Sequence, residues 1–179
     1  MKGAPLSRRH ALRAGLSIAL LLCVGQVSAR EISPGANFAP APSTYRGEAV
    51  VTGVADADTL YADIDGHSIR IRLAQIDAPE GAQAFGRRAE HSLRELVGRN
   101  EVDLSWKSLD RYGRPIAQMS VDGLDVNAEQ IRRGFAWVFR HYSKDETLIA
   151  FEAQAKASGL GLWADPHPVP PWDWRASRR

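Results

Sequence analysis

Residues 56–80 contain the residue types from which a site for a cation and a phosphate can be built. Arg72 lies in a strand-like segment where it alternates with apolar residues, so its side chain is expected to point away from the core. Carboxylate oxygens suit hard cations such as Ca²⁺ or Mg²⁺, and the planar guanidinium matches the oxygens of a phosphate. The carboxylates of this stretch are Asp56, Asp58, Asp77 and Glu80.

A β-hairpin is predicted to bring the two ends of this stretch together. Residues 59–64 and 67–73 have the pattern of strands, and Asp65-Gly66 between them favours the positive-φ hairpin turn. Such a hairpin places the acids at its start beside those that follow its second strand. The stretch is therefore expected to gather its carboxylates around its arginine.

Other kinds of catalytic or metal site find little support. The histidines show no paired spacing, and no Gly-x-Ser-x-Gly motif is present. A calcium loop of the EF-hand type beginning at Asp56 is excluded, because Tyr61 stands where that loop requires glycine. The only cysteine, Cys23, lies in a segment predicted to be removed, so neither a thiolate nor a zinc site is expected. Taken alone, Asp-x-Asp beside a strand is also compatible with a solvated turn.

A second arginine ends the tight loop from Asp110 to Arg114. Gly113 allows the backbone of this loop to approach a ligand closely. Arg114 would add a fixed cation to stabilise the charge that develops on a phosphate during substitution. An isolated loop arginine is usually only solvated. Its coincidence with Arg72 and the four acids in one short chain favours a phosphate-handling site.

The hydrophobic pattern predicts a small barrel accompanied by helices. Apolar residues alternate in the strands, while helical spacing and terminal glycines mark the helices. Strands are predicted at 47–54, 59–64, 67–73, 102–106 and 116–121, and helices at 87–97, from a cap at Asp125 or Asn127 to residues 132–134, and at 145–158. This pattern suits an α+β, mainly β fold, a five-stranded barrel of the OB-fold type with three helices.

The N-terminal 29 residues are predicted to be a signal peptide cleaved after Ala29. A basic opening precedes an apolar run too short to span a bilayer, so no retained membrane anchor is expected. Arg8-Arg9 resembles the twin-arginine signal, and the twin-arginine and Sec routes both stay open. The mature protein is expected to be periplasmic or secreted. It would carry 19 basic and 21 acidic residues, so the high isoelectric point of the whole chain is no sign of nucleic-acid binding.

Two segments outside the predicted barrel are rich in proline. Residues 30–46 show no hydrophobic period and are expected to be a disordered leader. Residues 165–179 are expected to form an extended Pro/Trp-rich tail after a domain covering residues 47–164. The tail's tryptophans could pack on the barrel, which we favour, or serve as a ligand for another domain.

Several motifs in succession resemble those of the staphylococcal nuclease (thermonuclease) family. The resemblance runs from about Gly47 to Trp163. It rests on their order and spacing: Asp56-Ala-Asp58-Thr59, Arg72-Leu-Ala-Gln-Ile-Asp77-Ala-Pro79-Glu80, Asp110-Arg-Tyr112-Gly113-Arg114, Asn127 to Gly134 and Gly159 to Trp163. The resemblance implies a five-stranded barrel with three helices and a calcium-dependent phosphodiesterase acting on DNA and RNA, with Mg²⁺ and Mn²⁺ as alternative cations.

The family resemblance also implies a role for each matching residue. Asp58, Asp77 and the backbone carbonyl of Ala78 would bind the metal directly, and Asp56 would bind it through water. Arg72 and Arg114 would hold the phosphate, and Glu80 would orient or deprotonate the attacking water. Tyr112, Arg140 and Tyr142 would contact the nucleotide.

Four departures from the family pattern bear on these roles. Ala78 replaces a threonine but keeps the carbonyl, and Ala57 replaces a glycine. The segment 81–86 is shorter than the corresponding mobile loop, and Arg140 falls where a tyrosine stacks near the base. Base preference is the property most affected, since an arginine can bind phosphate or stack on a base instead.

The leading hypothesis is an exported, monomeric, metal-dependent nuclease that cuts single-stranded or flexible DNA or RNA. A non-catalytic barrel that binds nucleic acid or protein is the main alternative. Such a module has no need to keep both arginines, Glu80 and the metal-binding aspartates together. A calcium site serving only stability would leave Glu80 and both arginines unexplained.

Overall fold

The computed structural model describes residues 41–98 and 101–178. The predicted signal peptide, and the predicted leader as far as residue 40, lie outside the described residues. Within the described part, no helix is long and apolar enough to cross a membrane.

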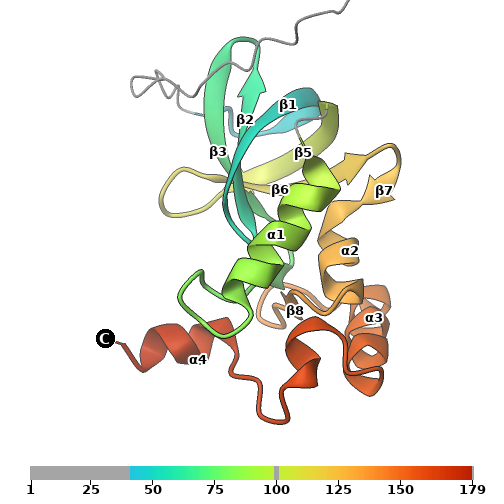
Figure 1. Ribbon diagram of the computed structural model, residues 1–179. Coiled ribbons are helices and arrows are strands. Elements are labelled where there is room, and N and C mark those ends of the chain that lie inside the picture. The colour runs from blue at the N-terminus through green and yellow to red at the C-terminus, as the bar shows by residue number, and fades with distance from the viewer. Residues whose placement is uncertain (1–40, 99–100, 179) are drawn as a thin grey trace, which may run out of the picture. The chain divides into compact units, whose positions relative to one another are not determined.

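Five strands form a barrel that is closed by one parallel pairing. The order is β3-β2-β1-β5-β6, with antiparallel neighbours, and β3 pairs in parallel with β6 (Figure 1). A short strand, β7, follows β6 as a hairpin partner. The strands are β1 (Tyr45–Asp56), β2 (Thr59–Ile64), β3 (His67–Leu73), β5 (Glu101–Leu109), β6 (Pro115–Val121) and β7 (Leu124–Asp125). The predicted fold class, a mainly β barrel with helices, is confirmed.

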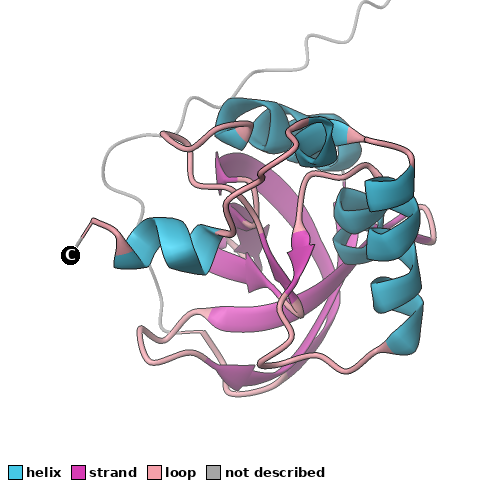
Figure 2. Cartoon of the chain, turned by 90° about the horizontal axis from the view of Figure 1, so that it is seen from below, coloured by secondary structure: helices cyan, strands magenta, loops and turns pink. Residues whose placement is uncertain are grey.

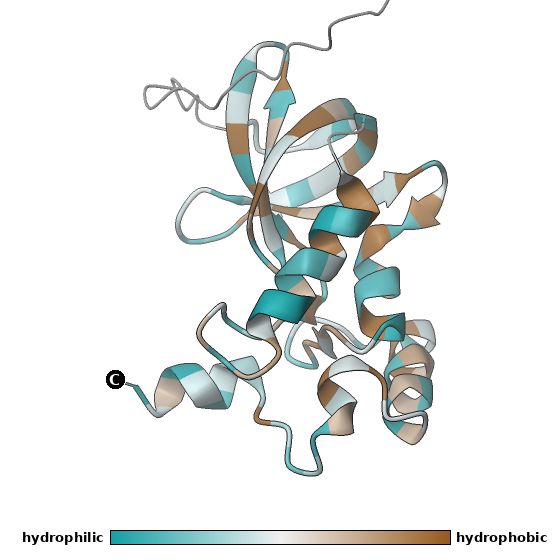
Figure 3. Ribbon diagram, viewed as in Figure 1, coloured by the Kyte–Doolittle hydropathy of each residue, from teal (hydrophilic) through white to brown (hydrophobic). Residues whose placement is uncertain are grey.

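Alternation of side chains along the strands fills the barrel. Hydrophobic and hydrophilic residues alternate along the ribbons of Figure 3, as expected when successive side chains point to opposite faces. Fully buried side chains of the barrel include Leu60, Ile71, Leu104 and Met119. Burying a side chain of this size contributes about 1.5–3 kcal/mol of hydrophobic stabilisation, so the barrel can present polar residues at one end without losing its core.

The predicted hairpin is present with the expected register. Thr59 faces Arg72 and Ile64 faces His67 across β2 and β3. Asp65 and Gly66 have φ values of 53° and 82°, as the predicted turn requires. At the open end, the backbone N–H of Leu73 donates to the carbonyl of Asp58 at 2.8 Å. The two ends of residues 56–80 therefore meet.

Three helices pack beside the barrel at the predicted places: α1 (Gly86–Val97), α2 (Val126–Arg132) and α3 (Glu146–Ala157). Asp125 is the residue that caps α2, accepting from the Ala128 N–H at 2.9 Å. Asn127 lies inside the helix and is buried. Asp145 caps α3 in the same way, and Figure 2 shows these helices gathered around the strands.

Two short strands form a second sheet below the barrel. β4 (Ile76–Asp77) pairs with β8 (Trp137–Val138), which places Asp77 opposite Trp137.

At the other end of the domain, β1 begins at Tyr45, two residues earlier than predicted. The Trp106 indole N–H anchors the preceding segment by donating to the Pro42 carbonyl at 2.9 Å.

The C-terminal tail differs in part from the prediction. After a 3₁₀ turn, η1 (Gly161–Ala164), the chain is free of regular structure as far as Pro170 and then forms a short helix, α4 (Pro171–Ala176). The expectation of an extended segment is therefore wrong from residue 171. Proline fits the first helical position, where its missing N–H leaves no helical bond unmade. The tail packs on the domain as favoured, but beside β8 and not on the barrel, because the Trp172 ring stacks on Phe139 with centroids 5.7 Å apart.

Candidate active site

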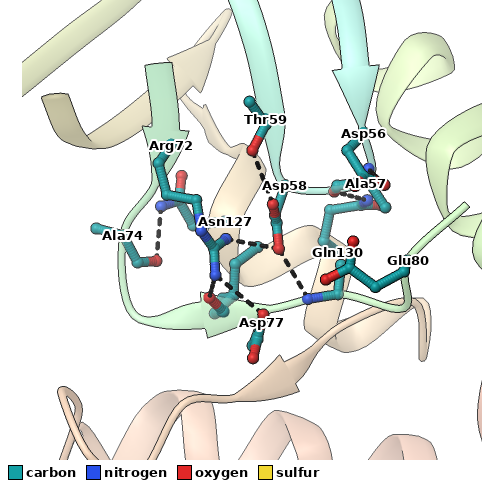
Figure 4. A network of polar contacts seen from close by, with 12 residues as sticks. Asp56, Ala57, Asp58, Thr59, Arg72, Ala74, Asp77, Glu80, Asn127 and Gln130 are labelled. Carbon is teal, nitrogen blue, oxygen red and sulfur yellow. Dashed lines mark hydrogen bonds and ion pairs between the residues drawn. The ribbon is translucent and has the colours of Figure 1, made fainter. Parts of the chain in front are cut away.

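Arg72 joins the two ends of the hairpin stretch. Its Nη1 lies 2.6 Å from Asp58 Oδ2, and its Nη2 lies 3.0 Å from Asp77 Oδ1. The same Nη2 also donates to the carbonyl of Ile76 at 3.1 Å. Figure 4 shows this guanidinium between the two carboxylates. The side chain of Asp77 is inaccessible to solvent, so its charge is balanced by cationic side chains instead of by water.

Asp58 is fixed from several sides. Its Oδ2 accepts from the Ala78 N–H at 2.9 Å, and its Oδ1 accepts from the Thr59 hydroxyl at 3.0 Å. The bond to Ala78 spans the open end of the hairpin and brings that residue beside Asp58. The roles predicted for Asp58, Asp77 and the Ala78 carbonyl as metal ligands remain predictions, and the structure places these three residues together.

Asp56, Asp58, Asp77 and Glu80 together form an acidic cluster, in which Asp56 and Glu80 lie on the other side from Arg72 (Figure 4). The pKa of Asp56 is raised to about 6, mainly by burial and also by the neighbouring charges of Asp58 and Glu80, while the hydrogen bond from the Ala57 N–H acts in the opposite direction. The carboxyl group of Asp56 therefore keeps its proton to a higher pH than an exposed aspartate does. A cation placed among these acids would favour its ionised form.

A second guanidinium enters the cluster from the C-terminal tail. Arg175, in α4, places Nη2 at 2.6 Å from Asp77 Oδ2 and Nη1 at 2.7 Å from Glu80 Oε1. Its Nη1 also donates to Asp77 Oδ1 at 3.2 Å. These hydrogen bonds raise the pKa of Arg175 and keep it cationic. Burial raises the pKa of Asp77, while Arg175 and Arg72 act in the opposite direction. The sequence predicted one guanidinium among four acids; the structure has two.

Two buried amides of α2 hold the backbone around the site. Asn127 Nδ2 donates to the carbonyls of Ala74 and Ala117 at 3.0 and 3.1 Å, which ties the segment after β3 to β6. Gln130 Nε2 donates to the carbonyl of Ala57 at 3.0 Å. Ala57 lies between Asp56 and Asp58 in the sequence. These amides fix backbone segments that carry the site without contacting its carboxylates.

Arg140 belongs to a different ion-pair cluster. Its Nη2 lies 2.8 Å from Oε2 of Glu152, whose other oxygen accepts from the Val138 N–H at 2.9 Å. Lys156 also contacts Glu152 at 2.9 Å. The structure therefore gives Arg140 a partner in α3, and its predicted contact with nucleotide remains a prediction. Glu152 was not singled out from the sequence, although an acid on the buried side of a predicted helix is a recognisable signal.

Arg114 is oriented by its own loop. Its Nε lies 2.7 Å from Asp110 Oδ2, and Asp110 Oδ1 accepts from the Arg114 N–H at 2.9 Å. These bonds lower the pKa of Asp110 despite its partial burial. The parallel pairing sets Ile116 opposite Arg72, so the loop ending at Arg114 enters β6 beside the end of β3 that carries the site.

The predicted nucleotide-binding tyrosines are both exposed but lie in different places. Tyr112 is 68% exposed. The guanidinium carbon of Arg114 lies over the Tyr112 ring, 5.5 Å from the ring centroid. Tyr142 is 70% exposed and meets Phe139 edge to face at 5.0 Å. Exposed aromatic rings of this kind are available to stack with bases.

The donor set fits a hard cation, but the carboxylates are occupied by arginines. Across residues 41–98 and 101–178, no three carboxylates, histidines or cysteines converge closely enough to hold an ion as they stand. The atoms of Asp58 and Asp77 that could bind a cation are nevertheless all oxygen atoms. The Arg175 guanidinium stands in for a cation by bridging Asp77 and Glu80. A cation that replaced it would find two carboxylates already directed toward one point.

Comparison with known proteins identifies the family to which these motifs belong. Residues 70–165 match the family described as Staphylococcal nuclease homologue. The chain is 39% identical over 151 residues to a micrococcal nuclease of Shigella flexneri, covering 78% of this chain and 86% of that protein. It is also 39% identical over 130 residues to an uncharacterized endonuclease of Haemophilus influenzae, covering 72% and 73% of the two chains. The match of residues 70–165 contains Arg72, Asp77, Glu80 and Arg114, and ends before Arg175.

Proposed function

This chain belongs to the staphylococcal nuclease family, and we propose that it is a metal-dependent phosphodiesterase that cleaves single-stranded or flexible DNA, RNA or both. The proposal is supported above all by one observation: Arg72 joins Asp58 to Asp77 and Arg175 joins Asp77 to Glu80, so three carboxylates are gathered around two cationic groups. The family match and the endonuclease relatives support action on nucleic acid.

Asp58, Asp77 and the Ala78 carbonyl would hold a hard divalent cation, for which we propose Ca²⁺ with Mg²⁺ and Mn²⁺ as alternatives. Asp56 would act on it through water. When bound, such an ion supplies Lewis-acid stabilisation of the phosphate oxygens. The other steps belong to the chain's own side chains.

Glu80 is the proposed acceptor of the proton from the attacking water. Its side chain is 33% exposed and its Oε1 contacts Arg175, so the carboxylate is within reach of solvent once that contact opens. A carboxylate positioned in this way as general base contributes about 10²–10⁴-fold to a rate.

Arg72 and Arg114 are the proposed phosphate-binding residues. Arg114 is held in place through Nε by Asp110, which fixes the direction of its guanidinium. Arg72 uses both terminal nitrogens on Asp58 and Asp77, so it has to release one of them before it contacts a phosphate. A fixed charge of this kind stabilises the transition state by about 3–4 kcal/mol.

We test this function by digesting denatured DNA and RNA with the mature protein in Ca²⁺, in Mg²⁺ or in chelator. Arg114→Ala is expected to lower the rate about 10²–10³-fold, whereas Arg46→Ala, a change at an exposed arginine of β1, should leave it within about threefold. Oligonucleotide binding without cleavage under every metal would favour the non-catalytic alternative. Equal rates for the wild type and Arg114→Ala would refute the assigned phosphate contact.

The proposed setting of this activity is outside the cytoplasm. Residues 1–29 have the features of a signal peptide, and we propose cleavage after Ala29 and release of a monomer. N-terminal sequencing of the exported protein should begin at Arg30. A protein that keeps its initial residues and stays with the cell membrane would refute export as a free enzyme.

A further inference from the structure

The C-terminal helix places a positive charge on two carboxylates of the proposed site, Asp77 and Glu80. Arg175 bridges Asp77 and Glu80 at 2.6 and 2.7 Å. It lies 98 positions after Asp77 and 95 positions after Glu80 in the chain. Arg175 is 40% exposed, whereas Asp77 is fully buried. The guanidinium therefore covers the solvent side of a carboxylate whose other oxygen faces Arg72.

Several contacts besides these ion pairs fix the position of Arg175. The side-chain amide of Gln83, in the loop after Glu80, donates to the Val169 carbonyl at 2.6 Å. Trp172 stacks on Phe139 at 5.7 Å and meets Trp137 edge to face at 5.8 Å. The segment 165–178 is thus docked on both sides of the acidic cluster before Arg175 is counted.

The same segment also packs on Phe139, a neighbour of the proposed nucleotide-binding residue Tyr142. Trp172 occupies one face of Phe139, and Tyr142 contacts the edge of that ring at 5.0 Å. Trp174 lines a small cavity together with Pro79 and Phe85, which flank Glu80 in the loop before α1. The tail therefore lies against the acids Asp77 and Glu80, the loop before α1, and the Phe139 ring beside Tyr142.

Asp77 cannot give the same oxygen atoms to Arg175 and to a divalent cation. We propose that residues 165–178 form an autoinhibitory segment in which Arg175 engages Asp77, a proposed cation ligand, and that cation binding and tail docking exclude each other. This inference rests on the proposed metal-dependent function, whose site it regulates. Competition of this kind raises the apparent dissociation constant of the cation by the inverse of the fraction of molecules with the tail released.

The test compares calcium binding by calorimetry for the full mature protein and its variants. Arg175→Ala should bind Ca²⁺ about tenfold more tightly than the wild type, a size set by two partly exposed ion pairs. Arg175→Lys keeps the charge but loses the fork that spans two carboxylates, so its affinity should fall between those of the other two. Arg178→Ala is the matched control, because Arg178 is exposed and contacts the ring of Trp174. Its affinity should equal that of the wild type.

Hydrogen exchange provides a readout that does not depend on activity. The amides of Trp174 and Ser177 donate within α4, to Pro170 and Asp173, and should exchange faster in the wild type when Ca²⁺ is saturating. In Arg175→Ala their exchange should already be fast without Ca²⁺.

Equal calcium affinities for the wild type and Arg175→Ala, or an α4 that stays equally protected with Ca²⁺, would overturn the autoinhibitory role while leaving the nuclease proposal standing. Weaker binding by Arg175→Ala would also overturn it, because Arg175 would then support the cation. Failure of every variant to bind Ca²⁺, Mg²⁺ or Mn²⁺ would overturn both proposals.

Discussion

Replacing Asn127 by alanine tests how the core of the domain holds the site. The amide is 1% exposed, donates to the carbonyls of Ala74 and Ala117, and accepts from the Met119 N–H at 3.2 Å. Each such bond contributes on the order of 1 kcal/mol, and a buried partner left unsatisfied costs more. We expect Asn127→Ala to lower the free energy of unfolding by about 3 kcal/mol, equivalent to a fall of about 10 °C in Tm.

The same change should reduce activity more than stability alone explains. Ala74 stands between Arg72 and Asp77, so loosening its carbonyl moves two groups that must be placed together. A displacement of about 1 Å can cost 10²-fold in rate. We expect a fall of about 10–100-fold in kcat at 25 °C, measured where the variant is still fully folded.

Urea unfolding in chelator, followed by tryptophan fluorescence, measures the stability change. The control is Gln154→Ala, which truncates an exposed amide on α3 and should stay within about 0.5 kcal/mol of the wild type. The reasoning is refuted if Asn127→Ala is as stable as this control, because the three hydrogen bonds would then contribute nothing measurable.

Three further changes test separate parts of the site. Gly86→Ala should destabilise the fold and lower activity, because its Cβ would overlap the Glu80 carbonyl oxygen; thermal unfolding and kinetics would show both effects. Asp110→Asn should lower kcat/KM about tenfold by releasing the Arg114 guanidinium, while a rate equal to wild type would contradict that orienting role. Because burial raises the pKa of Asp56 to about 6, the folded protein keeps a proton that the unfolded chain loses near pH 4. Stability in chelator should therefore fall as pH rises from about 4 to 6, and calcium affinity should rise over the same interval. Asp56→Asn should weaken both dependences and leave the part due to Asp77, whose pKa is also raised by burial, and unchanged pH profiles in that variant would refute this assignment.

The elements that could be predicted from the sequence are those specified by neighbouring residues. Alternating side chains and the Asp65-Gly66 turn determine the hairpin within fifteen residues, and its closure brings Asp58 to Arg72. The start of α3 is also specified locally, because the side chain of Asp145 accepts hydrogen bonds from the backbone N–H groups of Thr147 and Leu148. Local patterns of this kind are readable because each is satisfied by its own segment.

The features that could not be predicted depend on contacts between distant segments. Nothing local in the tail indicates that Arg175 reaches Asp77, because that contact joins residues 98 positions apart and lies outside the family match. Pro171 lies in a segment whose proline content predicts an extended chain, although proline also suits the start of a helix. The nucleotide contact predicted for Arg140 rests on the family resemblance, which gives no sign of its ion pair with Glu152, a buried acid of another element.

The most direct test of the account is the initial rate of cleavage of an end-labelled single-stranded oligonucleotide as free Ca²⁺ is raised from chelator to saturation. The wild type should show no cleavage in chelator and a saturable increase with Ca²⁺. Glu80→Gln should bind Ca²⁺ but cleave at least about 10²-fold more slowly at saturation, while Glu95→Gln, a change at an exposed acid on α1, should match the wild type. Cleavage that persists in chelator, or a Glu80→Gln variant as fast as the wild type, would contradict a metal-dependent reaction in which Glu80 takes the proton.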